Sequence, residues 1–516
     1  MISKVHSAVI KGIEAVPVTI ETDIVRGMPN LTITGLADAT VKEAAVRVRA
    51  AIVNSGYTFP LGRISVNIAP AGIKKKGSVL DLGLAVGILA ASGQIPAHEL
   101  DRYLFAGELS LDGSVCSARG ILNITEKAYE TGRSVIVPED NRNEAAIVNG
   151  ATVLPAGSLE DVTRHLTHAL EINPAETSYK TSEGKYIRTD SMDFADVRGQ
   201  EAAKRTLLIA AAGGHGVLMT GSPSTGKTML AERLPGIMPP MTYEEVIRAT
   251  EIYSAAGLLT GDMPYIIERP FRRPHHSVTE AGLIGGGMSP RPGEITLASG
   301  GILFLDEFAE IDTKVTDALR EPLERKEISF IRQGETYTFP ADFLLVAASN
   351  PCRCGYYGDP SGRCICTPGE VARYRQKLSG PVMDRIDIHL DLKGLAYSDL
   401  TGKAGMSTAE MKEMVIKARQ IQKERFKGLG YKLNSAMTDR MAKEMSYIDE
   451  KGERLLGRAY DAFGLSPRVL GKTIRVARTI ADLAGKDRVG SDDIAEALQY
   501  SRWEHNGNKD NNKGKR

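Results

Sequence analysis

Apolar and polar positions alternate along residues 1–170 with two different periods. Residues 15–20 and 64–68 are short apolar runs rich in β-branched side chains, which predicts strands. Residues 39–55 and 81–92 instead repeat apolar side chains at helical spacing, which predicts helices. The mixture predicts an N-terminal α+β domain that is large enough to bury a core of its own.

A polar stretch without helical periodicity follows over residues 171–193 and predicts a linker. Beyond it, residues 216–220, 301–305 and 344–351 contain apolar strands whose ends are polar or rich in glycine. Buried strands of this kind, separated by helical segments, predict a layered αβα core over residues 194–392.

Helical spacing dominates the remainder of the chain, over residues 393–505. The predicted helices cover residues 408–426, 453–463, 468–483 and 491–500. This pattern predicts an all-helical C-terminal domain. The last residues, 506–516, are polar and rich in Asn and Lys, which predicts a disordered tail.

Composition and charge exclude only a few classes of protein. Lys+Arg 65 against Asp+Glu 64 gives a net charge of +1, so any nucleic-acid contact has to come from local patches. The apolar tract at residues 79–91 is interrupted by Asp81 and is too short to span a bilayer. The N-terminus also lacks the apolar core of a signal peptide. We therefore expect a cytoplasmic protein with no membrane partner.

One short stretch fits the phosphate-binding pattern G-x-x-x-x-G-K-[ST] at every fixed position. It comprises Gly221, Ser222, Pro223, Ser224, Thr225, Gly226, Lys227 and Thr228. A predicted strand precedes it and a predicted helix follows it, which is the context that the pattern requires. Lys227 would reach the β- and γ-phosphates of ATP, and the Thr228 hydroxyl would ligate Mg²⁺. The chain is therefore predicted to hydrolyse ATP.

Side chains at the ends of two further predicted strands are predicted to supply the other groups that ATP hydrolysis needs. The strand at residues 301–305 leads into Asp306 and Glu307. Asp306 is predicted to hold Mg²⁺ through water, and Glu307 to polarise the attacking water. Asn350 ends the next apolar strand and is predicted to orient that water against the γ-phosphate.

Several strings resemble the magnesium-chelatase-like AAA+ ATPases called YifB or ComM, a competence-associated group of bacterial proteins. The most specific are residues 269–276, 284–287 and 292–298, and the likeness extends over essentially the whole chain. The resemblance implies a helix-2 insert, a pre-sensor-1 hairpin, a helical lid and a homo-oligomeric, hexameric ring. It also implies that Arg385 is an arginine finger that reaches a neighbouring subunit, and that Arg468 is the sensor-2 arginine.

Residues 1–170 resemble the ribosomal-S5-type fold that the Lon protease catalytic domain shares. The matching strings are residues 67–71, 76–81, 106–113 and 135–138. A Lon-like enzyme uses a Ser–Lys dyad. The matching positions here are Val79 and Asn123, and Ser78 is one residue out of register. The resemblance therefore implies a protease-inactive module that serves assembly or binds a protein partner.

The resemblance further implies that the motor moves along or remodels DNA, single-stranded or branched, as a helicase or in branch migration during recombination of incoming DNA. Arg272 and Arg273 in the insert and Arg332 near the hairpin tip are the candidate DNA contacts. Three alternatives stay open. These arginines could brace contacts between subunits, and the motor could serve a metal chelatase or act as an ATP-dependent regulatory scaffold on a protein client.

Four of the five cysteines form a cluster: Cys352, Cys354, Cys364 and Cys366. Four thiolates so close in sequence can complete a tetrahedral Zn²⁺ shell, which predicts a structural zinc. Free thiols or a redox pair are the alternatives, and disulfides are disfavoured in a reducing cytosol.

Overall fold

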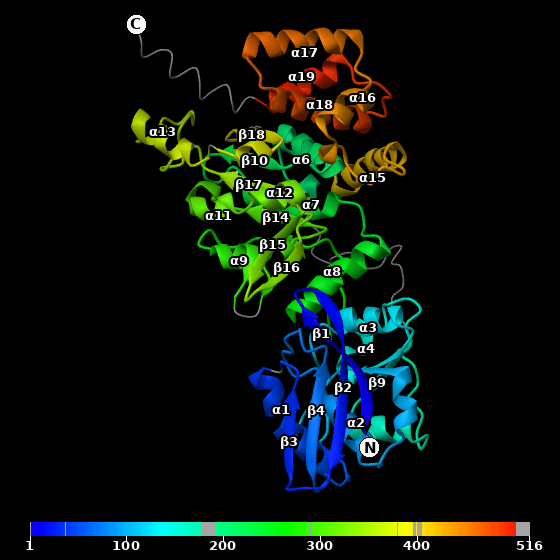
Figure 1. Ribbon diagram of the computed structural model, residues 1–516. Helices are drawn as coiled ribbons and strands as arrows, with labels where there is room; N and C mark the ends of the chain where they lie inside the picture. Colours follow the sequence, from blue (N-terminus) through cyan, green and yellow to red (C-terminus); the bar gives the residue numbers. More distant parts are fainter. Residues whose placement is uncertain are drawn as a thin grey trace.

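The computed structural model describes residues 2–36, 38–176, 192–287, 290–378, 380–395, 399 and 405–501. Most of the predicted linker (residues 171–193) and the whole predicted tail (residues 506–516) lie outside them. The described parts follow one another along the molecule in chain order (Figure 1): an N-terminal α/β part, a central α/β part and a helical C-terminal part. This is the fold class that the sequence predicts. Among the described helices, none is both long and apolar enough to cross a membrane.

The N-terminal part is built on a seven-stranded sheet with the order β3-β4-β2-β1-β5-β8-β9. Its strands are β1 (Ser3–Lys11), β2 (Glu14–Val25), β3 (Asn30–Thr34), β4 (Arg63–Ala69), β5 (Tyr103–Phe105), β8 (Ser134–Pro138) and β9 (Val153–Ala156), and a separate small pair is formed by β6 (Glu108–Leu109) and β7 (Val115–Cys116). Its helices are α1 (Ala39–Asn54), α2 (Asp81–Ala91), α3 (Ile121–Glu130), α4 (Arg142–Ala145) and α5 (Leu159–Leu166). Helix α2 is buried along its whole length, as its nearly all-apolar sequence requires.

The central part is built on a five-stranded parallel sheet with the order β11-β14-β17-β10-β18. Its strands are β10 (Val217–Gly221), β11 (Phe271–Arg272), β14 (Ile302–Leu305), β17 (Leu344–Ser349) and β18 (Ile388–Leu392). Strands β10, β14 and β17 are buried at every residue, as expected for a parallel sheet covered on both faces. Because the strands are parallel, their carboxyl ends meet at one edge, which we call the carboxyl edge. The opposite edge is the amino edge.

Helices α6 (Glu201–Gly213), α7 (Lys227–Ile237) and α13 (Pro368–Gln376) belong to the central part, as does α8 (Tyr243–Ala256). Helix α8 packs against α3 of the N-terminal part (Figure 1). The carboxylate of Glu144 is buried in this contact and accepts hydrogen bonds from the Ser254 hydroxyl and, at 2.9 Å, from the backbone N–H of Leu122. These bonds fix α8 on the N-terminal part.

Two short segments project from the central sheet. The insert contains α9 (Glu280–Ile284), β12 (Gly285–Gly286), β13 (Arg291–Pro292) and α10 (Glu294–Leu297); α11 (Thr313–Asp317) and α12 (Arg320–Arg325) lead into a hairpin of β15 (Glu327–Arg332) and β16 (Glu335–Pro340). The hairpin tip lies against the N-terminal part, because Lys74 Nζ donates to Gln333 Oε1 at 2.5 Å. Lys11 Nζ also lies 4.0 Å from Glu335 Oε2.

The C-terminal part contains α15 (Thr408–Arg425), α16 (Asp439–Ser446), α17 (Glu450–Phe463), α18 (Pro467–Leu483) and α19 (Ser491–Gln499). Ser407 caps α15 in a capping box with Glu410, and Ser466 caps α18. The Arg419 guanidinium donates to the carbonyl oxygen of Ala211 at 2.7 Å and 3.0 Å. This contact ties α15 to α6 of the central part.

Candidate ATP-binding site

The phosphate loop joins the carboxyl end of β10 to the first residue of α7. Gly226 has a φ of +88°, a left-handed conformation that favours glycine. Lys227 Nζ donates to the carbonyl oxygens of Gly221 at 2.6 Å and Ser222 at 2.9 Å. Burial lowers the pKa of Lys227, and the charge of Asp306 opposes this shift. The ammonium group is therefore folded into the loop, where phosphate oxygens could replace the two carbonyls.

Residues from two neighbouring strands meet this loop at the carboxyl edge, as the sequence predicts. Thr228 Oγ1 donates to Asp306 Oδ2 at 3.0 Å, and Lys227 Nζ donates to Asn350 Oδ1 at 3.3 Å. Hydroxyl and carboxylate oxygens are the ligands that Mg²⁺ prefers. The residues present therefore fit a magnesium nucleotide, with Thr228 and Asp306 as the metal-facing pair. Glu307 follows Asp306 with a φ of +50°, a conformation seldom adopted by residues other than glycine, asparagine and aspartate.

Two side chains that sequence reasoning did not assign to this site contact its carboxylates. Arg273 Nη2 lies 2.8 Å from Asp306 Oδ2, the same oxygen that accepts from Thr228. His276 Nδ1 lies 2.9 Å from Glu307 Oε2. Both residues follow β11 in the chain. Because β11 pairs in parallel with β14, the chain that follows β11 passes the carboxyl end of β14, where Asp306 and Glu307 lie. The signal available in the sequence was the string at residues 269–276, which carries three arginines and two histidines.

Arg385 lies at the amino edge, away from the phosphate loop of its own chain. It lies three residues before Ile388, the first residue of β18, which pairs with Val217 at the start of β10. The five residues of β10, about 16 Å of extended chain, lie between that point and the loop. The Arg385 guanidinium donates to the Glu324 carboxylate and to the carbonyl oxygen of Pro381. Its described contacts therefore include nothing at the carboxyl edge.

Arg468 is the second residue of α18 and lies beside Arg385. Its Nη1 is 3.3 Å from Asp384 Oδ2, and its Nη2 is 3.9 Å from Glu324 Oε1. The structure thus brings the two arginines predicted for ATP hydrolysis to each other, through the shared carboxylate of Glu324, and not to the phosphate loop.

The three candidate DNA-contacting arginines differ in their surroundings. Arg272 Nε and Nη2 donate to the two carboxylate oxygens of Glu294 at 2.7 Å and 2.8 Å. Arg273 is paired with Glu232 and Asp306. Such pairs within one chain neutralise and fix both guanidinium groups, so these two arginines do not form a free basic loop. Arg332 is exposed and stacks over Phe330 at 6.0 Å.

The four clustered cysteines converge at the carboxyl edge beyond Asn350. Their Sγ atoms all lie within 4.8 Å of one another, close enough to hold one metal ion. Backbone N–H groups of Tyr356 and Ile365 lower the pKa of Cys354 to about 6. The fifth cysteine, Cys116, lies in β7 of the N-terminal part.

The positions that match a Lon-like dyad have other surroundings here. Val79 is an apolar side chain with 8% of its surface exposed. Asn123 Nδ2 donates to the carbonyl oxygens of Ile13 at 2.7 Å and Glu251 at 3.2 Å. Asn123 therefore helps hold α8 on the N-terminal part.

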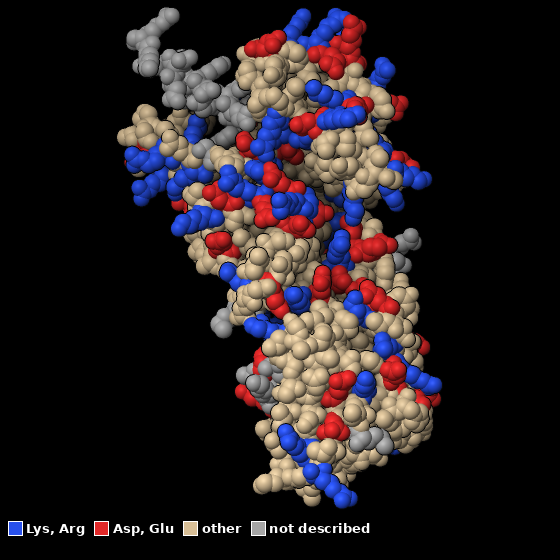
Figure 2. Space-filling view, viewed as in Figure 1, with Lys and Arg blue, Asp and Glu red and all other residues tan. Residues whose placement is uncertain are grey.

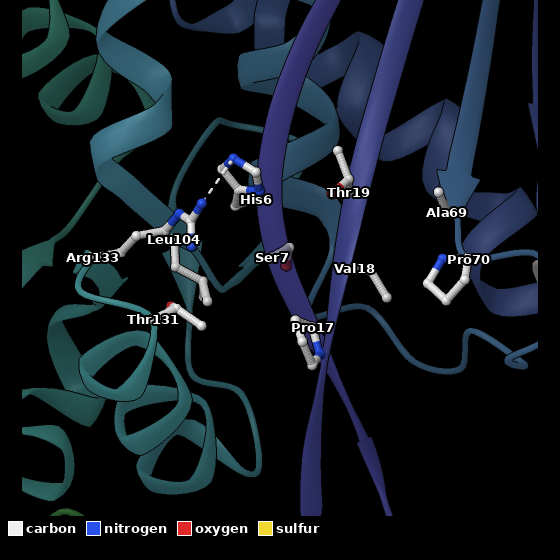
Figure 3. A pocket seen from close by; sticks show the side chains of 10 residues that line it. All are labelled: His6, Ser7, Pro17, Val18, Thr19, Ala69, Pro70, Leu104, Thr131 and Arg133. Atoms are coloured by element: carbon white, nitrogen blue, oxygen red, sulfur yellow. Dashed lines mark hydrogen bonds between the residues drawn. The ribbon is translucent and has the colours of Figure 1, made fainter.

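A hollow of about 400 Å³ opens on the N-terminal sheet (Figure 3). His6 and Arg133 lie side by side in its lining and point toward one another, with 3.4 Å between Arg133 Nη2 and His6 Nε2. The remaining lining is largely apolar and includes Pro17, Val18 and Leu104. The hollow shares no residue with the candidate ATP-binding site.

Comparison with known proteins decides the family. Competence protein ComM of Haemophilus influenzae is 40% identical to this chain over 500 residues, which is 96% of each protein. The uncharacterized protein YifB of Escherichia coli is 40% identical over 504 residues, 97% of each. This chain belongs to the ComM/YifB family. Zygotic DNA replication licensing factor mcm6 of Xenopus tropicalis is a more distant relative, 25% identical over 246 residues, which is 44% of this chain and 26% of that protein.

Three family models match consecutive stretches of this ComM/YifB member. "Subunit ChlI of Mg-chelatase" matches residues 20–141, "Magnesium chelatase, subunit ChlI" matches residues 193–400, and "Magnesium chelatase, subunit ChlI C-terminal" matches residues 405–501. Together with the site geometry, they mark the protein as a magnesium-chelatase-like AAA+ ATPase.

Proposed function

We propose that this ComM/YifB-family protein is a Mg²⁺-dependent ATPase that assembles into a hexameric ring and moves along or remodels DNA. One observation supports assembly into a ring. Lys227, Asp306 and Asn350 lie at the carboxyl edge of the sheet, whereas Arg385 lies at the amino edge. An arginine that stabilises the charge of the transferred phosphate has to come from a neighbouring chain in this arrangement.

The chain's own residues divide the work of ATP hydrolysis. Lys227, now bonded to loop carbonyls, would bind the β- and γ-phosphates, while Thr228 and Asp306 would hold Mg²⁺, which would neutralise phosphate charge. Glu307 accepts a proton from the attacking water, and Asn350 orients that water. Arg385 and Arg468 of the adjacent subunit approach the γ-phosphate from the other side.

Three observations favour DNA as the substrate. The relative from Haemophilus influenzae is named a competence protein, and the distant relative from Xenopus tropicalis is named a DNA replication licensing factor. Arg332 is exposed on the hairpin. On the face shown in Figure 2, basic side chains also gather beside α13, which carries Arg373 and Arg375. Elsewhere on that face basic and acidic side chains are interspersed, so binding should be local and sensitive to salt.

A second candidate function is that of a metal-chelatase-type motor, which the three chelatase family models favour. A regulatory scaffold is a third, because the hollow that His6 and Arg133 help to line could receive a protein client of the N-terminal part. Both share the ATPase chemistry and differ only in what the motor acts on.

The test is the ATPase rate with and without single-stranded and forked DNA, at two salt concentrations. Lys227→Ala, which removes the ammonium group from the phosphate loop, is the inactive control. We expect DNA to stimulate hydrolysis and the stimulation to fade at higher salt. Hydrolysis that no DNA stimulates would reject the DNA motor and favour the chelatase or scaffold.

The four-cysteine cluster is also part of the proposed function, as a structural Zn²⁺ site. Four thiolates leave no open coordination position for catalysis. The ion would therefore stabilise the loop between Asn350 and α13.

A further inference from the structure

The sulfur geometry of the cysteine cluster fits a tetrahedral metal better than a disulfide. The Sγ–Sγ distances are 3.4 Å between Cys352 and Cys354, 3.7 Å between Cys354 and Cys364, and 3.9 Å between Cys352 and Cys364. A tetrahedron with metal–sulfur bonds of about 2.3 Å has sulfur–sulfur edges of about 3.8 Å. A disulfide requires about 2.05 Å. The three measured edges are therefore those of an S₄ zinc shell.

The loop that these cysteines close, residues 352–366, lies directly on the phosphate loop. Gly355 has a φ of +86° and approaches Pro223 so closely that a Cβ atom there would be 2.8 Å from Pro223 Cγ and Cδ. The Asp359 carboxylate accepts a hydrogen bond from the backbone N–H of Ser361 at 2.8 Å, and the Ser222 side chain favours its charged form and so helps lower its pKa. Two consecutive residues of the phosphate loop thus meet the cysteine loop, Pro223 by packing against Gly355 and Ser222 through its interaction with Asp359.

We propose that the metal-bound cysteine loop is a clamp on the phosphate loop, with Asp359 and Gly355 as its positioning residues. The inference rests on the zinc site and the ATP-binding site proposed above. The phosphate loop binds its ligand through backbone N–H groups, so their orientation has to be fixed for tight binding. Zinc fixes the cysteine loop, and the cysteine loop then limits the movement of Ser222 and Pro223.

The metal is tested first, on the full-length protein. We expect about one zinc per chain by elemental analysis, and thiolate-to-metal absorption when Co²⁺ replaces the zinc. The double substitution Cys364→Ser/Cys366→Ser should abolish both signals. Cys116→Ser, which changes the cysteine outside the cluster, should leave both unchanged. A wild-type protein without zinc, whose Co²⁺ spectrum equals that of the double variant, would overturn the proposal.

The clamp is tested with a variant that keeps all four cysteines. Asp359→Asn removes the negative charge that the Ser222 side chain favours, and we expect the Kd of a fluorescent ATP analogue to rise about fivefold, the size of effect that the loss of one polar contact has. Its zinc content should stay at the wild-type value. Ile365→Ala is the matched control, because this side chain is 87% exposed although it lies between two of the cysteines. A zinc-loaded Asp359→Asn protein with the wild-type Kd would overturn the clamp.

The test of the clamp can fail or succeed independently of the test of the proposed DNA motor. Zinc content and nucleotide Kd are measured without hydrolysis and without DNA. A protein that DNA does not stimulate, but whose nucleotide Kd depends on Asp359, would reject the DNA motor and keep the clamp. The reverse result would keep the motor and reject the clamp.

Discussion

The two edges of the central sheet carry different sets of the side chains that the proposed ATPase reaction needs. At the carboxyl edge, Lys227, Thr228 and Asp306 form a hydrogen-bonded group around the phosphate loop. At the amino edge, Arg385 and Arg468 share the carboxylate of Glu324. Within one chain the strands keep these groups apart, whereas in the proposed ring head-to-tail packing would bring the amino edge of one subunit to the carboxyl edge of the next. Under this proposal, one subunit holds two half-sites and no complete one.

The largest effect is expected at the amino edge. Arg385→Ala should lower kcat about 10³-fold, as loss of an arginine finger does in other ATPases and GTPases. The Kd for ATP should change little, because Arg385 is remote from the phosphate loop of its own chain. Steady-state ATPase rates and nucleotide titration check both values. Arg320→Ala, an exposed arginine of α12, is the control, and a fall in its kcat equal to that of Arg385→Ala would contradict the assignment.

At the carboxyl edge, Glu307→Gln should lower kcat about 10²-fold while ATP binding is retained. The amide has the size of the carboxylate but cannot accept the proton of the attacking water. Single-turnover hydrolysis and nucleotide titration separate the two steps. Unchanged single-turnover rates would remove Glu307 from the reaction.

A smaller effect is expected from the histidine that contacts Glu307. His276→Ala should lower kcat about tenfold with little change in the Kd for ATP, because it frees a carboxylate whose position matters for proton transfer. His275→Ala is the matched control, since the described hydrogen bonds of His275 go to Ser277. Equal effects of the two substitutions would show that the pair acts through the local fold and not through Glu307.

The smallest effect is expected for the pH dependence of stability. It concerns Glu251, which lies outside both edges, where α8 meets the N-terminal part. Burial and a hydrogen bond with the Glu126 side chain raise the pKa of Glu251 from 4.5 to about 9. The folded protein therefore holds one more proton than the unfolded chain between about pH 4.5 and pH 9, so this group's contribution to stability falls as pH rises through that window and is lost above about pH 9.

We expect the Tm of the wild-type protein to fall between pH 7 and pH 9.5, and Glu251→Gln to reduce that fall. The amide cannot ionise, so this variant removes the proton linkage while it keeps the size of the side chain. Thermal unfolding at both pH values checks the difference. Identical pH dependence in the two proteins would contradict the shifted pKa of Glu251.

Local sequence signals predicted the carboxyl edge well. The strand before Gly221 and the helix after it are β10 and α7, and Asp306 follows β14 as the apolar run predicts. The spacing of the cysteines likewise predicted a cluster that could hold a metal. Each of these features depends on residues that are close in sequence. Hydrophobic periodicity and turn-forming residues predict local structure at that range.

Apart from the meeting of Asp306 and Asn350 with the phosphate loop, contacts between distant residues were not predicted. Nothing in the local pattern pairs His276 with Glu307 or Arg273 with Asp306, because both pairings depend on which strand lies beside β14. The basic string at residues 269–276 therefore suggested a free DNA-binding loop, although carboxylates hold Arg272 and Arg273. The packing of α8 on the N-terminal part was missed for the same reason.

The most direct test of an active site divided between two subunits is to mix two inactive variants. Lys227→Ala removes the carboxyl half-site, and Arg385→Ala removes the amino half-site. In randomly mixed rings, about a quarter of the interfaces combine an intact half-site from each variant. We predict that equal amounts of the two proteins, mixed and reassembled, recover up to about a quarter of the wild-type ATPase rate. Mixed rings, verified by differently tagged subunits, that remain as inactive as either variant alone would contradict the account.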